Sequence, residues 1–131
     1  MKPGSMSATS FAPKSLAASH RQFGKSASDL VAADGVDPRG PRFQAAQLQH
    51  KIANSVRESL LATGVNLETY AERHRSTIPG MSYDRLVRIL RGETQMQFAD
   101  VVTWASQFPT VRAMLVRDQT WPPLTSMDPG V

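Results

Sequence analysis

The chain has 131 residues, no cysteine and a formal net charge of +4, from 15 Lys and Arg against 11 Asp and Glu. The lack of cysteine excludes disulfides, thiolate catalysis and cysteine-based metal sites, and no apolar run approaches the roughly 20 residues that cross a bilayer. The length fits one domain with a flexible arm, and the mild positive charge favours an anionic partner.

Residues 1–40 are rich in Ser, Ala, Gly and Pro, and their scattered apolar residues follow no helical or strand period. Such a segment buries too little apolar surface to offset its chain entropy, so we expect a disordered or flexible arm. A weakly basic arm that lies along DNA is the functional alternative. Two prolines and a glycine in 37–41 mark the boundary with the folded domain.

Residues 41–118 show helical spacing. In the first helix apolar residues recur every four positions, and Gly64 supplies its C-terminal stop. Asn66 caps a second helix, whose stripe ends at His74, and Ser82 caps a third, which Gly92 ends. The stripes of the first two helices are Leu48, Ile52, Val56 and Leu60, then Leu67, Tyr70, Ala71 and His74.

Two further helices complete the predicted domain. The fourth carries Phe98, Val101, Val102, Ala105 and Phe108 on one side and ends at Pro109. The fifth opens at Thr110 and carries Val111, Met114 and Leu115 inward. Residues 119–131 form an irregular tail, in which Trp121 either folds back onto the core or is exposed. No segment alternates as a strand would, so we predict an all-α, compact five-helix bundle.

The third helix, 82–91, separates into two faces at about 100° per residue. Its apolar face holds Tyr83, Leu86, Val87, Ile89 and Leu90, and its polar face holds Asp84, Arg85, Arg88 and Arg91. A guanidinium fork matches guanine edges and phosphates, and a helix fits the major groove of DNA. The pattern indicates a helix that packs on a small core and presents arginines outward.

Residues 66–108 resemble the Cro/lambda-repressor-like (Xre-type) helix-turn-helix family. The resemblance rests on Tyr70-Ala71 in the second helix, Gly80-Met81-Ser82 before the third, Leu86, Ile89 and Gly92 within and after it, and Phe98, Val101, Val102 and Ala105 in the fourth. The chain is longer than usual for the family at 75–79. Either the second helix is longer or the turn is enlarged. Leu67 replaces the glutamine that often contacts phosphate there.

The resemblance implies a helix-turn-helix that inserts the helix 82–91 into the major groove of double-stranded DNA. The implied base-reading residues are Tyr83, Asp84, Arg85 and Arg88. The implied phosphate-binding residues are Arg73, Arg75, Thr77, Ser82 and Arg91. Asp84 either accepts from a cytosine amine or orients Arg88 one turn on.

The expected function is therefore a transcriptional regulator, repressor-like and of bacterial or phage type, in the cytoplasm with the nucleoid. We expect a homodimer through the fifth helix and the Trp121 region. The alternative is a protein-interaction module that has kept the fold and lost DNA binding. His20, His50 and His74 lack metal-ligand spacing and no nucleophilic triad is evident, so we expect no enzyme, cofactor or metal.

Overall fold

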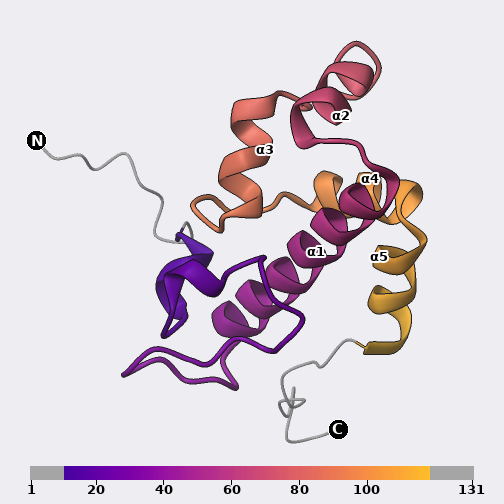
Figure 1. Cartoon of the computed structure of the whole chain (residues 1–131). Helices are drawn as coiled ribbons and strands as arrows, with labels where there is room; N and C mark the ends of the chain where they lie inside the picture. The colour runs from indigo at the N-terminus through magenta and orange to yellow at the C-terminus, as the bar shows by residue number, and fades with distance from the viewer. Residues whose placement is uncertain (1–10, 119–131) are drawn as a thin grey trace, which may run out of the picture.

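The computed structural model describes residues 11–118, which form an all-α structure with five α-helices. These helices are α1 (Pro41–Thr63), α2 (Leu67–His74), α3 (Tyr83–Leu90), α4 (Phe98–Gln107) and α5 (Pro109–Ala113), and a π-helical turn, Met114–Asp118, follows α5. Figure 1 shows α1 running through the middle of the molecule, with α3 and α5 on opposite sides of it. The predicted five-helix fold class is confirmed.

Local sequence signals fix most helix ends. The Asn66 side chain accepts a hydrogen bond from the Thr69 N–H at 2.8 Å, and the Ser82 hydroxyl accepts one from the Arg85 N–H at 3.3 Å. Gly64 ends α1 in the left-handed conformation, with φ of +72°. The predicted caps and stop are therefore present. Pro109 occupies the first turn of α5, so that helix begins one residue before the predicted Thr110.

The main core gathers residues from all five helices. Its fully buried members include Ile52 and Val56 of α1, Leu86, Ile89 and Leu90 of α3, Trp104 of α4 and Val111 of α5. Truncating one such residue to alanine costs about 2–5 kcal/mol in a typical core. The core therefore holds α3 firmly in place, with its apolar side against α1 and its polar side free for contacts elsewhere.

The prediction of which α4 residues face the core is partly wrong. Phe98 is 85% exposed and Val102 is 60% exposed, whereas Trp104 is 1% exposed. Two residues apart on a helix point about 200° apart, so a buried Trp104 turns Val102 outward. Phe108, four residues after Trp104, shares its buried side. The largest side chain decides the rotation of the helix, and the spacing of the smaller apolar residues does not.

Residues 11–40 pack against the helical domain, contrary to the prediction of an arm without structure. Two short 3-10 helices, Pro13–Leu16 and His20–Gln22, lie beside the first half of α1 (Figure 1). Their neighbours Ala17, Phe23 and Leu30 are buried in a second apolar cluster with Phe43 and Ala46 of α1. The apolar residues that lack a period of their own are covered by α1. Residues 1–10 of the predicted arm lie outside the described residues.

Side chains of α1 supply hydrogen bonds that this segment lacks on its own. Gln47 Oε1 accepts from the Leu30 N–H at 2.9 Å. His50, fully buried, accepts from the Gly24 N–H at Nδ1 (2.8 Å) and donates from Nε2 to the Ser28 carbonyl (2.7 Å). Because one partner only donates and the other only accepts, the ring is held in its neutral Nε2–H form. Burial lowers the pKa of His50 from its ordinary value.

The same segment also touches the end of α3 through two glycines. The Lys14 N–H donates to the Gly92 carbonyl at 2.9 Å. Gly92 has φ of +75°, and a Cβ there would lie 2.7 Å from the Phe23 ring. Gly24 has φ of +71°, and its Cβ would lie 2.4 Å from the Leu90 carbonyl oxygen. Only glycine permits this close approach, which brings residues 14–25 against the C-terminal end of α3.

No helix within residues 11–118 combines the length and the apolar character needed to cross a membrane. The tail 119–131, including the predicted dimer residue Trp121, lies outside the described residues.

Candidate nucleic-acid interface

The helices α2 and α3 pack against each other and are joined by an enlarged connection, 75–82. Of the two alternatives that the sequence left open, α2 keeps a short length and ends at His74, so the surplus residues lie in the connection. Gly80 takes φ of +79° there, which allows the chain to turn toward Ser82.

Arg85 does not project freely into solvent, and the prediction that it does is wrong. Its Nη1 and Nη2 donate to the two carboxylate oxygens of Asp100 on α4, at 2.9 and 2.7 Å, and Nη1 also donates to the Gly80 carbonyl at 3.1 Å. The side chains of Arg85 and Asp100 are only 24% and 15% exposed. The hydrogen bonds that Arg85 donates to Asp100 raise the pKa of Arg85 from its ordinary value. A fork engaged in this way is not available to a guanine edge.

Asp100 is held in place from its own side as well. Its Oδ2 accepts from the Gln97 N–H at 2.8 Å, at the first turn of α4. The carboxylate therefore caps α4 and clamps the beginning of α3 at once. This pairing joins residues far apart in sequence, and the periodicity of α3 alone gives no sign of it.

Arg88 and Arg91 lie further along α3 and are exposed. Within residues 11–118 neither side chain forms a hydrogen bond or an ion pair. Asp84 forms no ion pair with Arg88, so the predicted orientation of Arg88 by Asp84 is not seen. Residues three apart are neighbours on a helix surface. The two guanidinium groups are thus free to bind an anion.

The remaining predicted residues lie at the other end of α3, on α2 or in the connection between the two helices. Tyr83 is 44% exposed and Asp84 is exposed, at the N-terminal end of α3. The predicted phosphate ligands Arg73, Arg75, Thr77 and Ser82 are all exposed. Arg75 forms an exposed ion pair with Glu72 at 3.4 Å, which is weak in water. None of these four residues lines a hollow with Arg91.

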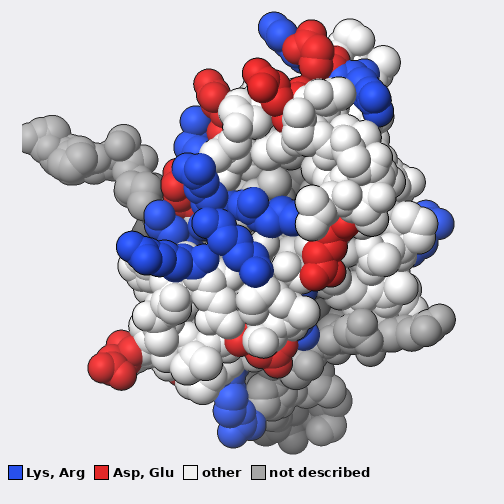
Figure 2. Space-filling view, viewed as in Figure 1, with Lys and Arg blue, Asp and Glu red and all other residues white. Residues whose placement is uncertain are grey.

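Arg91 instead faces cationic residues of the N-terminal segment, which belong to the weakly basic arm expected from the sequence but not to the predicted site residues. A hollow of about 180 Å³ is lined by Lys14, His20, Arg21, Phe23, Lys25, Arg91 and Glu93, and we call it the basic hollow. Figure 2 shows Lys and Arg side chains gathering where the C-terminal end of α3 meets the N-terminal segment. The one acid, Glu93, forms an ion pair with Lys14 at 3.7 Å. The positive charge of the hollow is therefore only partly balanced.

Arg57 of α1 adds a further charge beside the basic hollow. Burial, and then the neighbouring charge of Arg91, lower the pKa of Arg57. Its buried Nε has no hydrogen-bond partner within residues 11–118. Such an arrangement costs free energy, because a buried donor without an acceptor loses its hydration and two like charges repel.

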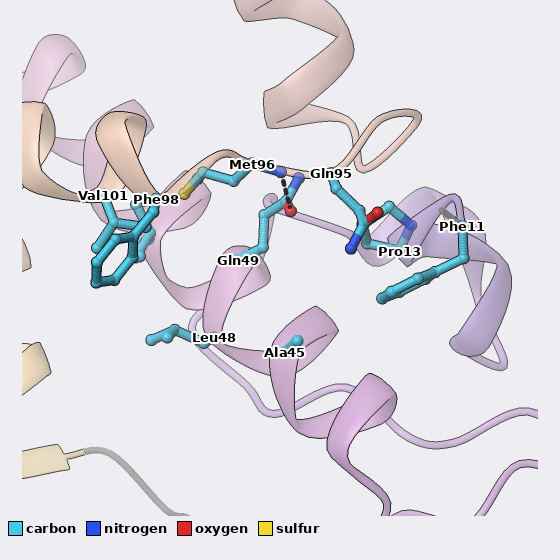
Figure 3. A pocket seen from close by; sticks show the side chains of 10 residues that line it. Phe11, Pro13, Ala45, Leu48, Gln49, Gln95, Met96, Phe98 and Val101 are labelled. Carbon is cyan, nitrogen blue, oxygen red and sulfur yellow. Dashed lines mark hydrogen bonds between the residues drawn. The ribbon is translucent and has the colours of Figure 1, made fainter. Parts of the chain in front are cut away.

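An apolar groove of about 160 Å³ lies on another part of the surface, between the N-terminal segment, α1 and α4 (Figure 3). Its walls include Phe11, Leu48, Met96 and the exposed Phe98. Gln49 lies in the groove, but its amide already donates to the Ile89 and Thr94 carbonyls and accepts from the Met96 N–H, each within 2.9 Å. The groove therefore offers an occupant mainly apolar contact.

No family model, curated protein or solved structure matches this chain. The resemblance to the helix-turn-helix family thus rests on the residues of this sequence alone.

Proposed function

We propose that this protein binds double-stranded DNA and acts as a transcriptional regulator, repressor-like, with α3 facing the major groove. The observation that carries the proposal is the exposed and unpaired state of Arg88 and Arg91 on a helix whose opposite side is fixed in the core. A rigid helix that presents two free guanidinium forks suits the groove and the phosphates beside it.

Arg88 is the proposed base-reading residue, with Tyr83 and Asp84 nearer the start of the helix. Arg85 is no longer among the proposed base-reading residues. Its role is that of a positioning residue, because its pair with Asp100 fixes the start of α3 against α4. Arg91 is a proposed phosphate ligand, and Arg73, Arg75, Thr77 and Ser82 remain weaker proposals for that role. A homodimer through the α5 region and Trp121 stays a proposal as well.

Selection from a random pool of DNA duplexes tests this function most completely. We expect a recovered motif, whose symmetry and half-site spacing would also report the oligomeric state. Arg88→Ala should then reduce discrimination at one base position by about 1–3 kcal/mol. Arg73→Ala, a matched exposed arginine, should weaken all sequences alike. If both variants weakened all sequences equally, Arg88 would not be a base reader, and an unenriched pool would refute sequence-specific binding.

A second candidate is a protein-interaction module that has kept the fold without DNA binding. The engaged Arg85 and the strongly exposed Phe98 beside an apolar groove favour it. In that case Arg88 and Arg91 would dock on an acidic protein partner. The absence of duplex binding even at low salt concentration, where phosphate contacts are strongest, would favour this candidate over the first.

A further inference from the structure

We propose that the basic hollow binds a phosphate group of the DNA backbone. This inference rests on the function proposed above. The N-terminal segment would then supply phosphate contacts of its own at the C-terminal end of α3. This placement differs from the phosphate ligands expected from sequence, most of which lie on α2 and the connection before α3.

The shape and charge of the hollow fit this ligand. Arg21 and Lys25 are exposed at its rim, Arg91 reaches it from α3, and Lys14 is partly neutralised by Glu93. These side chains come from two segments far apart in sequence, held together by the contacts of Gly24 and Gly92. Cations that converge on a concave surface focus positive potential there and attract a compact anion.

The uncompensated charge of Arg57 is an independent observation that supports an anion in the basic hollow. An arginine that is half-buried, has an orphaned Nε and lies beside Arg91 is an unfavourable arrangement in the free protein. A phosphate oxygen nearby would relieve the repulsion between the two guanidinium groups. The protein therefore carries a local electrostatic cost that an anion in the hollow would offset.

A phosphate is a better match than a carboxylate or a neutral ligand. Its several oxygens can accept from more than one arginine or lysine at once, and the hollow is lined by Arg21, Lys25 and Arg91. The hollow contains one apolar side chain, Phe23, whose ring is buried against Gly92. No deep apolar surface is therefore available for an organic ligand, and charge dominates the recognition.

The test compares two double variants that each remove two positive charges. Arg21→Gln/Lys25→Gln changes the hollow, whereas Arg39→Gln/Arg112→Gln changes exposed arginines that do not line it. The first measurement follows the backbone amide resonances of Gly24 and Gly92 by NMR as inorganic phosphate is added. The second measures the affinity for a DNA duplex as salt concentration is varied.

We expect saturable phosphate shifts in the wild type and the control, and their loss in Arg21→Gln/Lys25→Gln. We also expect that variant to reduce the log–log salt slope by about 0.9, because the hollow then loses its one phosphate contact. Equal shifts and slopes in both variants would overturn the inference and leave the proposed function intact. Phosphate shifts that depend on Arg21 and Lys25, without duplex binding by the wild type, would confirm the site and refute both the DNA source and the proposed function.

Discussion

The two ends of α3 use their arginines differently. At the N-terminal end, Arg85 is held by both carboxylate oxygens of Asp100 and by a backbone carbonyl. At the C-terminal end, Arg88 and Arg91 are exposed and have no partner within residues 11–118, and the basic hollow lies beside Arg91. The arginine at the first end is engaged in a partly buried ion pair, whereas the guanidinium groups at the second end stay exposed.

This difference shows that a stripe of arginines on one helix is not a single functional surface. Each guanidinium group is available only if no carboxylate from another element reaches it. Asp100 reaches Arg85 because α4 begins beside α3, and no acid among residues 11–118 forms an ion pair with Arg88. The neighbouring elements, more than the helix itself, therefore decide which arginines remain free.

The largest expected effect on stability is at the N-terminal end of α3, where Arg85 is held by Asp100. Asp100→Ala should lower the free energy of unfolding by about 2–4 kcal/mol, because it leaves the guanidinium of Arg85 without its carboxylate and removes the cap of α4. Urea denaturation measures this change. Asp84→Ala is the matched control, since Asp84 is also an acid in a first helical turn but is exposed. It should change stability by about 0.5 kcal/mol or less. Similar losses in the two variants would remove the distinction between the ends.

A smaller effect on stability, of opposite sign, is expected near the C-terminal end of α3. Arg57→Met should raise the free energy of unfolding by about 1 kcal/mol, because it removes an unpaired buried donor and a charge that repels Arg91. The same variant should bind duplex DNA more weakly, which separates stability from function. Arg88→Met removes an exposed arginine from the same region and should leave stability unchanged. A loss of stability in Arg57→Met would show that Arg57 is a structural residue.

The smallest effect is a dependence on pH that acts through the N-terminal segment. The pKa of His50 is lowered from 6.5 in the folded protein, so the unfolded chain binds the proton more readily. The stabilisation is therefore complete above about pH 6.5 and is lost as the pH falls through the lowered folded-state pKa. Urea denaturation at several pH values should show this decline in the wild type. In His50→Gln the decline should be weaker, and an equal decline in both proteins would assign it to other groups.

The helices and their ends could be predicted because their signals are local. Asn66, Ser82 and Gly64 act within a few residues of themselves, and apolar residues at helical spacing identify α1, α2 and α3. The same reasoning failed for α4, where Trp104 determines the buried face and turns Phe98 outward. Periodicity gives the existence of a helix more reliably than its rotation.

The features that could not be predicted depend on contacts between segments that are distant in the sequence. Residues 11–40 show no period, because their order depends on side chains of α1 such as Gln47 and His50. The candidate site was predicted in part: Arg88 and Arg91 are exposed as expected, whereas the engagement of Arg85 depends on Asp100 in another helix. Arg21 and Lys25 reach Arg91 only through the close approach at Gly24 and Gly92, which their positions in the sequence do not reveal.

The most direct test of the central claim is the salt dependence of duplex binding by Arg88→Ala/Arg91→Ala. A matched control, Arg39→Ala/Arg112→Ala, removes two exposed arginines elsewhere. If the C-terminal end of α3 faces DNA, the wild type should show a steep log–log slope. The first double variant should reduce that slope by about 0.9, because Arg91 is the proposed phosphate ligand and Arg88 the proposed base reader, and the control should leave it unchanged. A flat slope in the wild type, or an equal reduction in both variants, would contradict the claim.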